Sequence, residues 1–237
     1  ALSCDKDMKS SAFYISRGGE CADRGAFYIK IAEEGNADAC VDVLERAVED
    51  GWSRTVLDAI LDSDDYIAMG RAIAYLDEGD EKQEIVSFLA STDPDGRGCA
   101  FALRCAFLSE NDEEMLVDRL EEVGFAEPLV EAGLYAPLSE GSLRRIFRVI
   151  PEADPTGHSL VDAVETLFPP KIDDRLHLIA GALSEMKPGI WSFASPQMMR
   201  LGILLRDGLY SLLDKMNKIE KTGEPKKNGE TEDMENA

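Results

Sequence analysis

The sequence lacks the short motifs that mark most catalytic and nucleotide-binding sites. It contains no GxGxxG, no GxxxxGK[ST] and no GxSxG pattern, so it offers neither a glycine-rich phosphate loop nor a serine nucleophile elbow. Its only histidines, His158 and His177, stand in no HxxxH or HExxH pattern. Asp173 lies four residues before His177, but two side chains are too few for a metal site. We therefore expect a protein that is not an enzyme, with no catalytic residue, no cofactor and no metal.

Cysteine is scarce, and the number of cysteines is odd. The five show no regular spacing and form no CxxC pair, which argues against both a disulfide framework and a zinc site. They are Cys4, Cys21, Cys40, Cys99 and Cys105. Reduced thiols favour a cytoplasmic location, although Cys4 and Cys21 could pair in a secreted protein. No apolar run is long enough to cross a membrane.

Basic residues are also few. Lysine and arginine together number 25 against 47 acidic residues, which gives a formal net charge of -22. A field of this sign disfavours direct contact with nucleic acid or an anionic membrane, and favours basic partners. A solvated acidic surface explains the charge most simply. An acidic groove for a basic peptide, mimicry of nucleic acid and adaptation to high salt are the alternatives.

What the sequence does contain is a repeated helical pattern. From Gly35 to Gly189, apolar residues recur at i, i+3, i+4 and i+7 in segments separated by short polar breaks, with a period of about 31 residues. Alternation with period two, which would indicate strands, is not sustained anywhere. The pattern predicts an all-α fold of helical hairpins stacked as an α-α superhelix, in which each unit buries its apolar face against its neighbours.

The breaks between helices predict where helices begin and end. Asp93-Pro94-Asp95-Gly96 is expected to be a turn between two units. In the next unit we expect Phe107 and Leu108 to belong to the apolar face of the first helix. The break then falls at Asn111 and Asp112, either of which could cap the helix that follows.

One unit resembles a tetratricopeptide repeat. After the Gly35 turn, Cys40, Leu44 and Ala47 fall at the small, large and small positions of that family's second helix, although Trp52 occupies the place of its closing proline. HEAT and armadillo repeats are similar to the remaining units to the same degree. These resemblances imply a concave surface that binds peptides or proteins.

The C-terminal part differs from the repeats. Ser195 and Pro196 are typical of a helix start, and the helix that they open is predicted to reach Lys221. It either caps the repeats or forms a homodimer through a coiled-coil-like seam. We expect one domain over residues 1–221 and a disordered polar tail over residues 222–237.

These features favour a protein-protein interaction module: an adaptor, scaffold subunit or cochaperone that binds a basic or amphipathic segment. The alternatives are an acidic inhibitor that mimics nucleic acid and an enzyme with a helical pocket that the sequence does not reveal. Arg144 and Arg148 share a helix face, where they could bind a partner or pair with neighbouring acids. Trp191 and Phe193 are either buried or exposed anchors. The candidate partner-binding residues are Trp191, Phe193, Arg144, Arg148, Leu205, Leu212 and Met216.

Overall fold

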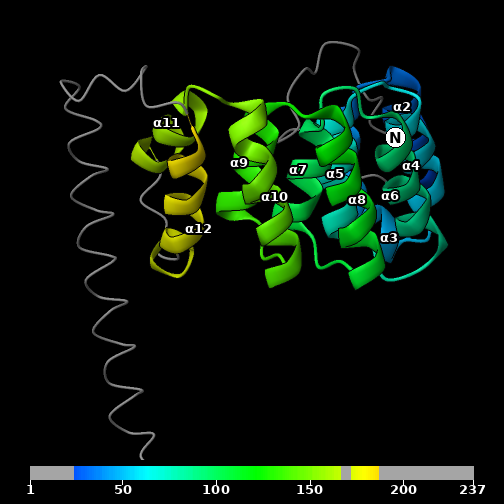
Figure 1. Ribbon diagram of the computed structural model, residues 1–237. Helices are drawn as coiled ribbons and strands as arrows, with labels where there is room; N and C mark the ends of the chain where they lie inside the picture. Colours follow the sequence, from blue (N-terminus) through cyan, green and yellow to red (C-terminus); the bar gives the residue numbers. More distant parts are fainter. Residues whose placement is uncertain (1–23, 167–171, 187–237) are drawn as a thin grey trace, which may run out of the picture.

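The computed structural model describes residues 24–166 and 172–186, and every regular element in these ranges is a helix (Figure 1). The all-α prediction is therefore confirmed for this part of the chain. The helices are α2 (Arg24–Glu34), α3 (Ala37–Glu49), α4 (Ser53–Leu61), α5 (Tyr66–Ala72), the 3-10 turn η1 (Ile73–Tyr75), α6 (Asp80–Thr92), α7 (Arg97–Cys105), α8 (Glu110–Val123), α9 (Ala126–Tyr135), α10 (Glu140–Ala153), α11 (His158–Thr166) and α12 (Ile172–Glu185).

Helices two apart in the sequence pack against each other, so the chain forms two layers. In one layer α3 contacts α5, α5 contacts α7, α7 contacts α9 and α9 contacts α11. In the other, α2 contacts α4, while α6, α8, α10 and α12 pack in succession. Figure 1 shows the described helices side by side, with the colours running from blue through green to yellow along the row. A single cluster of buried apolar side chains extends from Phe27 in α2 to Met186 after α12.

Four of the described α-helices begin with a side-chain cap. The side chains of Asn36, Asp65, Ser109 and Ser139 each accept a hydrogen bond from a backbone N–H in the first turn of the following helix. The expectation that Asn111 or Asp112 caps the helix after the predicted break was wrong, because Ser109 is the N-cap of that helix, α8. The break lies earlier than predicted because α7 already ends at Cys105.

Two buried aspartates organise the turns between units. Asp93 accepts hydrogen bonds from the backbone N–H groups of Gly96 and Cys99, at 3.1 and 2.9 Å. Asp154 accepts in the same way from the N–H groups of His158 and Ser159, at 3.1 and 2.9 Å. Each carboxylate thus accepts hydrogen bonds from backbone N–H groups that have no partner within the helix they begin. The predicted turn at Asp93–Gly96 is confirmed.

Long-range hydrogen bonds fix successive units to one another. Lys82 of α6 donates to the carbonyl oxygen of Phe107 at 2.5 Å, and Glu113 of α8 accepts from the N–H of Ser139 at 3.1 Å. Arg175 of α12 is buried and donates to the carbonyls of Gly133 and Ala136, at 2.7 Å each, at the end of α9. Each bond joins the first turns of one helix to a helix end or loop of the neighbouring unit.

The residues that carry the tetratricopeptide resemblance are buried as that pattern implies. Gly35 has a φ of +63°, a left-handed conformation that glycine adopts without strain, and it separates α2 from α3. Cys40, Leu44 and Ala47 of α3 are all fully buried. The predicted helix from Ser195 to Lys221, the tail over 222–237 and therefore the extent of the single domain lie outside the described residues.

Candidate functional site: a groove between α4 and α6

Of the predicted partner-binding residues, only Arg144 and Arg148 lie in the described part of the chain. Arg144 is exposed and pairs with Glu140 at 2.5 Å, within α10. Arg148 is also exposed, and no ion pair involving it is found among the described residues. The other predicted residues fall in the stretch that the structure does not describe: Trp191, Phe193, Leu205, Leu212 and Met216.

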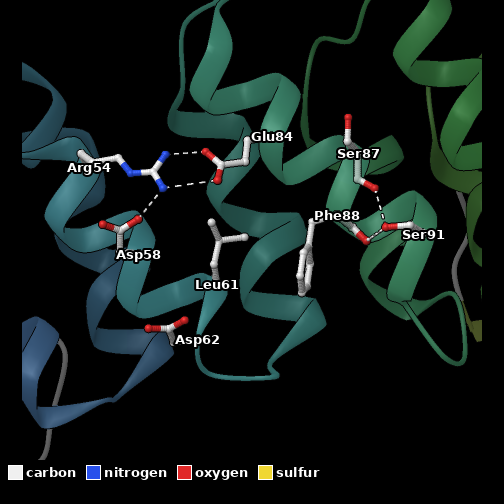
Figure 2. Close-up of a pocket in the computed structure, with 8 residues that line it drawn as sticks. All are labelled: Arg54, Asp58, Leu61, Asp62, Glu84, Ser87, Phe88 and Ser91. Carbon is white, nitrogen blue, oxygen red and sulfur yellow. Dashed lines mark hydrogen bonds and ion pairs between the residues drawn. The ribbon is translucent and has the colours of Figure 1, made fainter.

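The structure reveals a different candidate site where the second layer of helices opens. In this layer neighbouring helices pack closely, with the exception of α4 and α6, which approach each other at few points. The space between them is a groove of about 610 Å³. Figure 2 shows its lining, contributed by one face of α4 with the residue after it and by one face of α6: Arg54, Asp58, Leu61, Asp62, Glu84, Ser87, Phe88 and Ser91.

One end of the groove is closed by polar bridges between the two helices. Arg54 of α4 reaches across to Glu84 of α6 and also pairs with Asp58 at 2.6 Å on its own helix. The hydroxyl of Ser53 donates to the carboxylate of Glu81 at 2.9 Å. The hydrogen bond from Arg54 lowers the pKa of the Glu84 carboxyl below its ordinary value of 4.5. The bridges therefore hold ionised groups in a fixed arrangement.

The other end of the groove carries an acid without a counter-ion. Asp62 follows α4 and is exposed, and no ion pair or side-chain hydrogen bond of Asp62 is found in the described residues. The turn continues to Asp64, which has a φ of +55°, and to Asp65, whose side chain is committed to capping α5. In all, the lining contains three carboxylates and one guanidinium, so the groove is acidic.

Between the two ends the groove has an apolar floor. Leu61 and Phe88 are half-buried, and Figure 2 shows both side chains lying between the helices. The ring of Phe88 stacks on Tyr66, with 6.5 Å between ring centroids and 18° between planes. This contact fixes the ring. A fixed apolar floor beside an unpaired carboxylate is suited to hold an apolar side chain and a neighbouring cation.

The described residues offer little other chemistry. No group of three or more His, Cys, Asp or Glu side chains within residues 24–166 and 172–186 could hold a metal ion. Burial raises the pKa of the Cys40 thiol to about 11, and burial followed by the nearby Asp93 raises that of Cys99 further. Both stay as unreactive thiols at neutral pH. His158 is exposed and lies 3.3 Å from Asp162.

Sequence reasoning missed the groove, although part of its signal was present. Arg54 and Glu84 are 30 residues apart, close to the predicted period, as are Arg97 and Glu127, which pair at 2.8 Å between α7 and α9. Opposite charges separated by one period therefore indicate contacts between units. The charge pattern indicates that α4 and α6 are neighbours, but it does not indicate the groove between them, because the groove depends on how closely the two helices approach in space.

None of the helices in the described ranges combines the length and apolarity needed to cross a bilayer. No family model matches the sequence, and neither the curated proteins nor the solved structures contain a significant match to it.

Proposed function

We propose that this chain is a non-enzymatic protein-interaction module, an adaptor, scaffold subunit or cochaperone, that binds a basic or amphipathic segment of another protein. Its helical pairs would stack as an α-α superhelix of the tetratricopeptide, HEAT or armadillo kind, with the predicted C-terminal helix as a cap or a homodimer contact. The observation that carries the proposal is the acidic groove between α4 and α6 with its apolar floor. A cytoplasmic location remains part of the same proposal.

The groove favours such a segment for two physical reasons. An apolar side chain that contacts Leu61 and Phe88 would remove apolar surface from water, which stabilises a complex by about 25 cal/mol per Å². A lysine or arginine placed near Asp62 would meet a carboxylate that has no internal counter-ion, so no existing ion pair would have to break. A peptide with a cation three or four residues from a large apolar side chain presents both groups on one helical face.

A library of random linear peptides displayed on phage and selected against the full chain tests this proposal. We expect selected peptides to combine lysine or arginine with a large apolar residue. A selected peptide should bind Asp62→Lys and Phe88→Ala at least about tenfold more weakly, a loss of about 1.4 kcal/mol. Glu152→Lys is the matched control, because Glu152 is an exposed acid near the end of α10, away from the groove.

Two results would contradict the proposal. Selected peptides could lack basic residues altogether, or they could bind the groove variants and the control equally. Circular dichroism of Phe88→Ala is needed beside the binding data, since the ring also contacts Tyr66.

The acidic mimic of nucleic acid is a second candidate, supported by the distribution of charge. Several described arginines are bound to acids of a neighbouring helix, such as Arg71 to Asp42 at 3.2 Å and Arg104 to Glu131 at 2.6 Å. Exposed carboxylates without such partners therefore dominate the surface field. A mimic's binding should weaken strongly as ionic strength rises, whereas binding that depends on Leu61 and Phe88 should persist. Titrating one partner at low and high salt separates the two candidates.

A further inference from the structure

Phe107 is a large apolar side chain that the fold leaves almost entirely in water. It is 93% exposed, whereas the other exposed large apolar residues among those described lie between 40% and 53%. The sequence pattern placed it on the apolar face of a helix, and this prediction was wrong. Phe107 instead lies in the break between α7 and α8, after the last residue of α7.

The exposure of the ring does not result from a loosely held loop. The carbonyl oxygen of Phe107 accepts a hydrogen bond from Lys82 at 2.5 Å, and Lys82 is 4% exposed. Glu78 holds the same ammonium group at 2.5 Å. On one side Ala106 is buried and its N–H closes α7, and on the other Ser109 caps α8. The backbone that carries the ring is therefore fixed from three directions.

The fold itself does not require an aromatic residue at this position. Phe107 stands two residues before the N-cap of α8, and the same place before α6 and α10 is held by Asp77 and Pro137. Both of these residues are exposed. Because an aspartate and a proline serve equally in the neighbouring units, packing gives no reason for the phenylalanine. Aromatic residues are enriched among the residues that dominate binding energy at interfaces, so a binding role accounts for the phenylalanine.

We propose that Phe107 is a preorganised anchor that inserts into an apolar pocket of a partner protein, and that lysine or arginine side chains border this pocket. Aromatic anchors in pockets dominate the energetics of many interfaces, and a ring on a fixed backbone loses little entropy when it binds. The basic border follows from charge. The exposed acids in this region for which no ion pair is found among the described residues are Asp77 and Asp80, before and at the start of α6, and Glu110 at the start of α8, whereas Glu78 is already paired with Lys82.

A second copy of this chain is a poor occupant for the same electrostatic reason. The α4–α6 groove of another copy is acidic, and each chain carries a net charge of -22. Two such surfaces repel each other. The inference does not depend on the groove, because Phe107 lies in the loop before α8 and is not among the residues that line the groove.

Photo-crosslinking identifies the partner surface. The full chain with p-benzoylphenylalanine at position 107 is irradiated in a lysate of the source cells, and the crosslinked residues are mapped by mass spectrometry. The same analogue at position 125 is the control, because Phe125 is also exposed and lies at the opposite end of α8. We expect an adduct specific to position 107, in an apolar pocket of another protein bordered by lysine or arginine.

Titration of the purified crosslinked protein then decides the proposal. Phe107→Ala should weaken binding at least about tenfold, and Phe107→Leu by less. Phe125→Ala should change the affinity less than twofold, and the Tm of Phe107→Ala should equal that of the unaltered chain because the ring makes no packing contact. Lys82→Met keeps the ring of Phe107 but removes the hydrogen bond from Lys82 to the Phe107 carbonyl oxygen. It should therefore reduce the affinity severalfold, because the backbone that carries the ring is less well fixed before binding.

Several outcomes would overturn the inference. In the crosslinking experiment these are identical adducts from positions 107 and 125, an adduct only with a second copy of this chain, or an adduct in a pocket bordered by acids. In the titration it is an affinity of Phe107→Ala within twofold of that of the unaltered chain.

Discussion

Two pairs of neighbouring helices pack in opposite ways. Helices α5 and α7 are in close contact, whereas α4 and α6 are separated by a groove. At α5 and α7 the backbones touch: a Cβ added at Gly70 would lie 2.4 Å from the carbonyl oxygen of Gly98, and one at Gly98 would lie 2.4 Å from that of Tyr66. At α4 and α6 the backbones stand apart, and charged side chains span the space. Close packing leaves no room for a ligand, whereas the wider spacing creates a groove with accessible polar groups.

The difference follows from the residues at the two contacts. Glycine in both α5 and α7 removes the side chains that would keep the helices apart. The facing positions of α4 and α6 carry arginine and glutamate, whose charged groups would lose their hydration if the helices packed closely, and phenylalanine, whose ring occupies space between the backbones. Close packing therefore provides stability at one contact, and long polar side chains leave an open polar groove at the other.

Gly98→Ala should have the largest effect, because it tests the close contact directly. The new methyl group would meet the backbone of Tyr66, which cannot move without shifting α5, so we expect a loss of about 2–4 kcal/mol in the free energy of unfolding. Urea unfolding followed by circular dichroism measures it. Gly181→Ala is the control: it lies in α12 with open space around its Cβ, and should stabilise the chain by up to about 1 kcal/mol. Equal effects of the two substitutions would contradict the glycine contact.

Asp93→Ala should have the next largest effect. It leaves the buried N–H groups of Gly96 and Cys99 without their acceptor at the start of α7, the helix that carries Gly98. We expect a loss of about 1–3 kcal/mol, with Asp93→Asn losing less because its amide oxygen still accepts. Thermal unfolding with hydrogen exchange of the α7 amides measures both. Unchanged exchange in α7 would show that the carboxylate does not hold this helix start.

Arg54→Ala should have a smaller effect, and it tests whether bridges across the groove contribute to stability. Arg54 is 55% exposed, so its ion pairs are screened and the Tm should fall only slightly. Arg145→Ala removes the comparable bridge between α8 and α10, which pack closely, and should lower the Tm more because Arg145 is 30% exposed. High salt should reduce the difference between the variants. A larger fall for Arg54→Ala would mean that the groove helices depend on their bridges.

The smallest effect is expected for Glu84, in how its contribution to the free energy of unfolding changes with pH. Its pKa is lowered in the folded state by the hydrogen bond from Arg54, so its contribution to stability is present above about pH 4.5 and disappears as the pH falls through the lowered pKa. Glu84→Gln should therefore differ from the unaltered chain at pH 7 and converge with it in acid. Glu114→Gln is the control, since Glu114 is the exposed residue one unit later. NMR titration of Glu84 that gave an ordinary pKa would refute the bridge in solution.

The local features of the described helices could be predicted from the sequence. Apolar periodicity gives α6 and α9 because a helix buries one stripe. The Asp93–Gly96 turn follows from a proline that disfavours a helical residue before it and from Gly96, whose positive φ ends the helical path. The capping of α8 was missed by a few residues, since Ser109, Asn111 and Asp112 are all good capping residues and only the position where α7 ends chooses among them. The burial of Cys40, Leu44 and Ala47 agrees with the positions that the tetratricopeptide resemblance gave them.

Only the tertiary structure decided which side chains became available for binding. Phe107 has the same hydrophobicity as the buried Phe147. Its exposure follows from the end of α7 at Cys105 and from the hydrogen bond that Lys82 of α6 donates to its carbonyl oxygen. The groove likewise depends on the distance between α4 and α6, set by contacts of other helices. The sequence by itself determined the helices, their breaks and the sign of the charge, because these depend on residues near one another in the chain. Distances between helices depend on all their side chains at once, and these distances fixed the groove and the exposed ring.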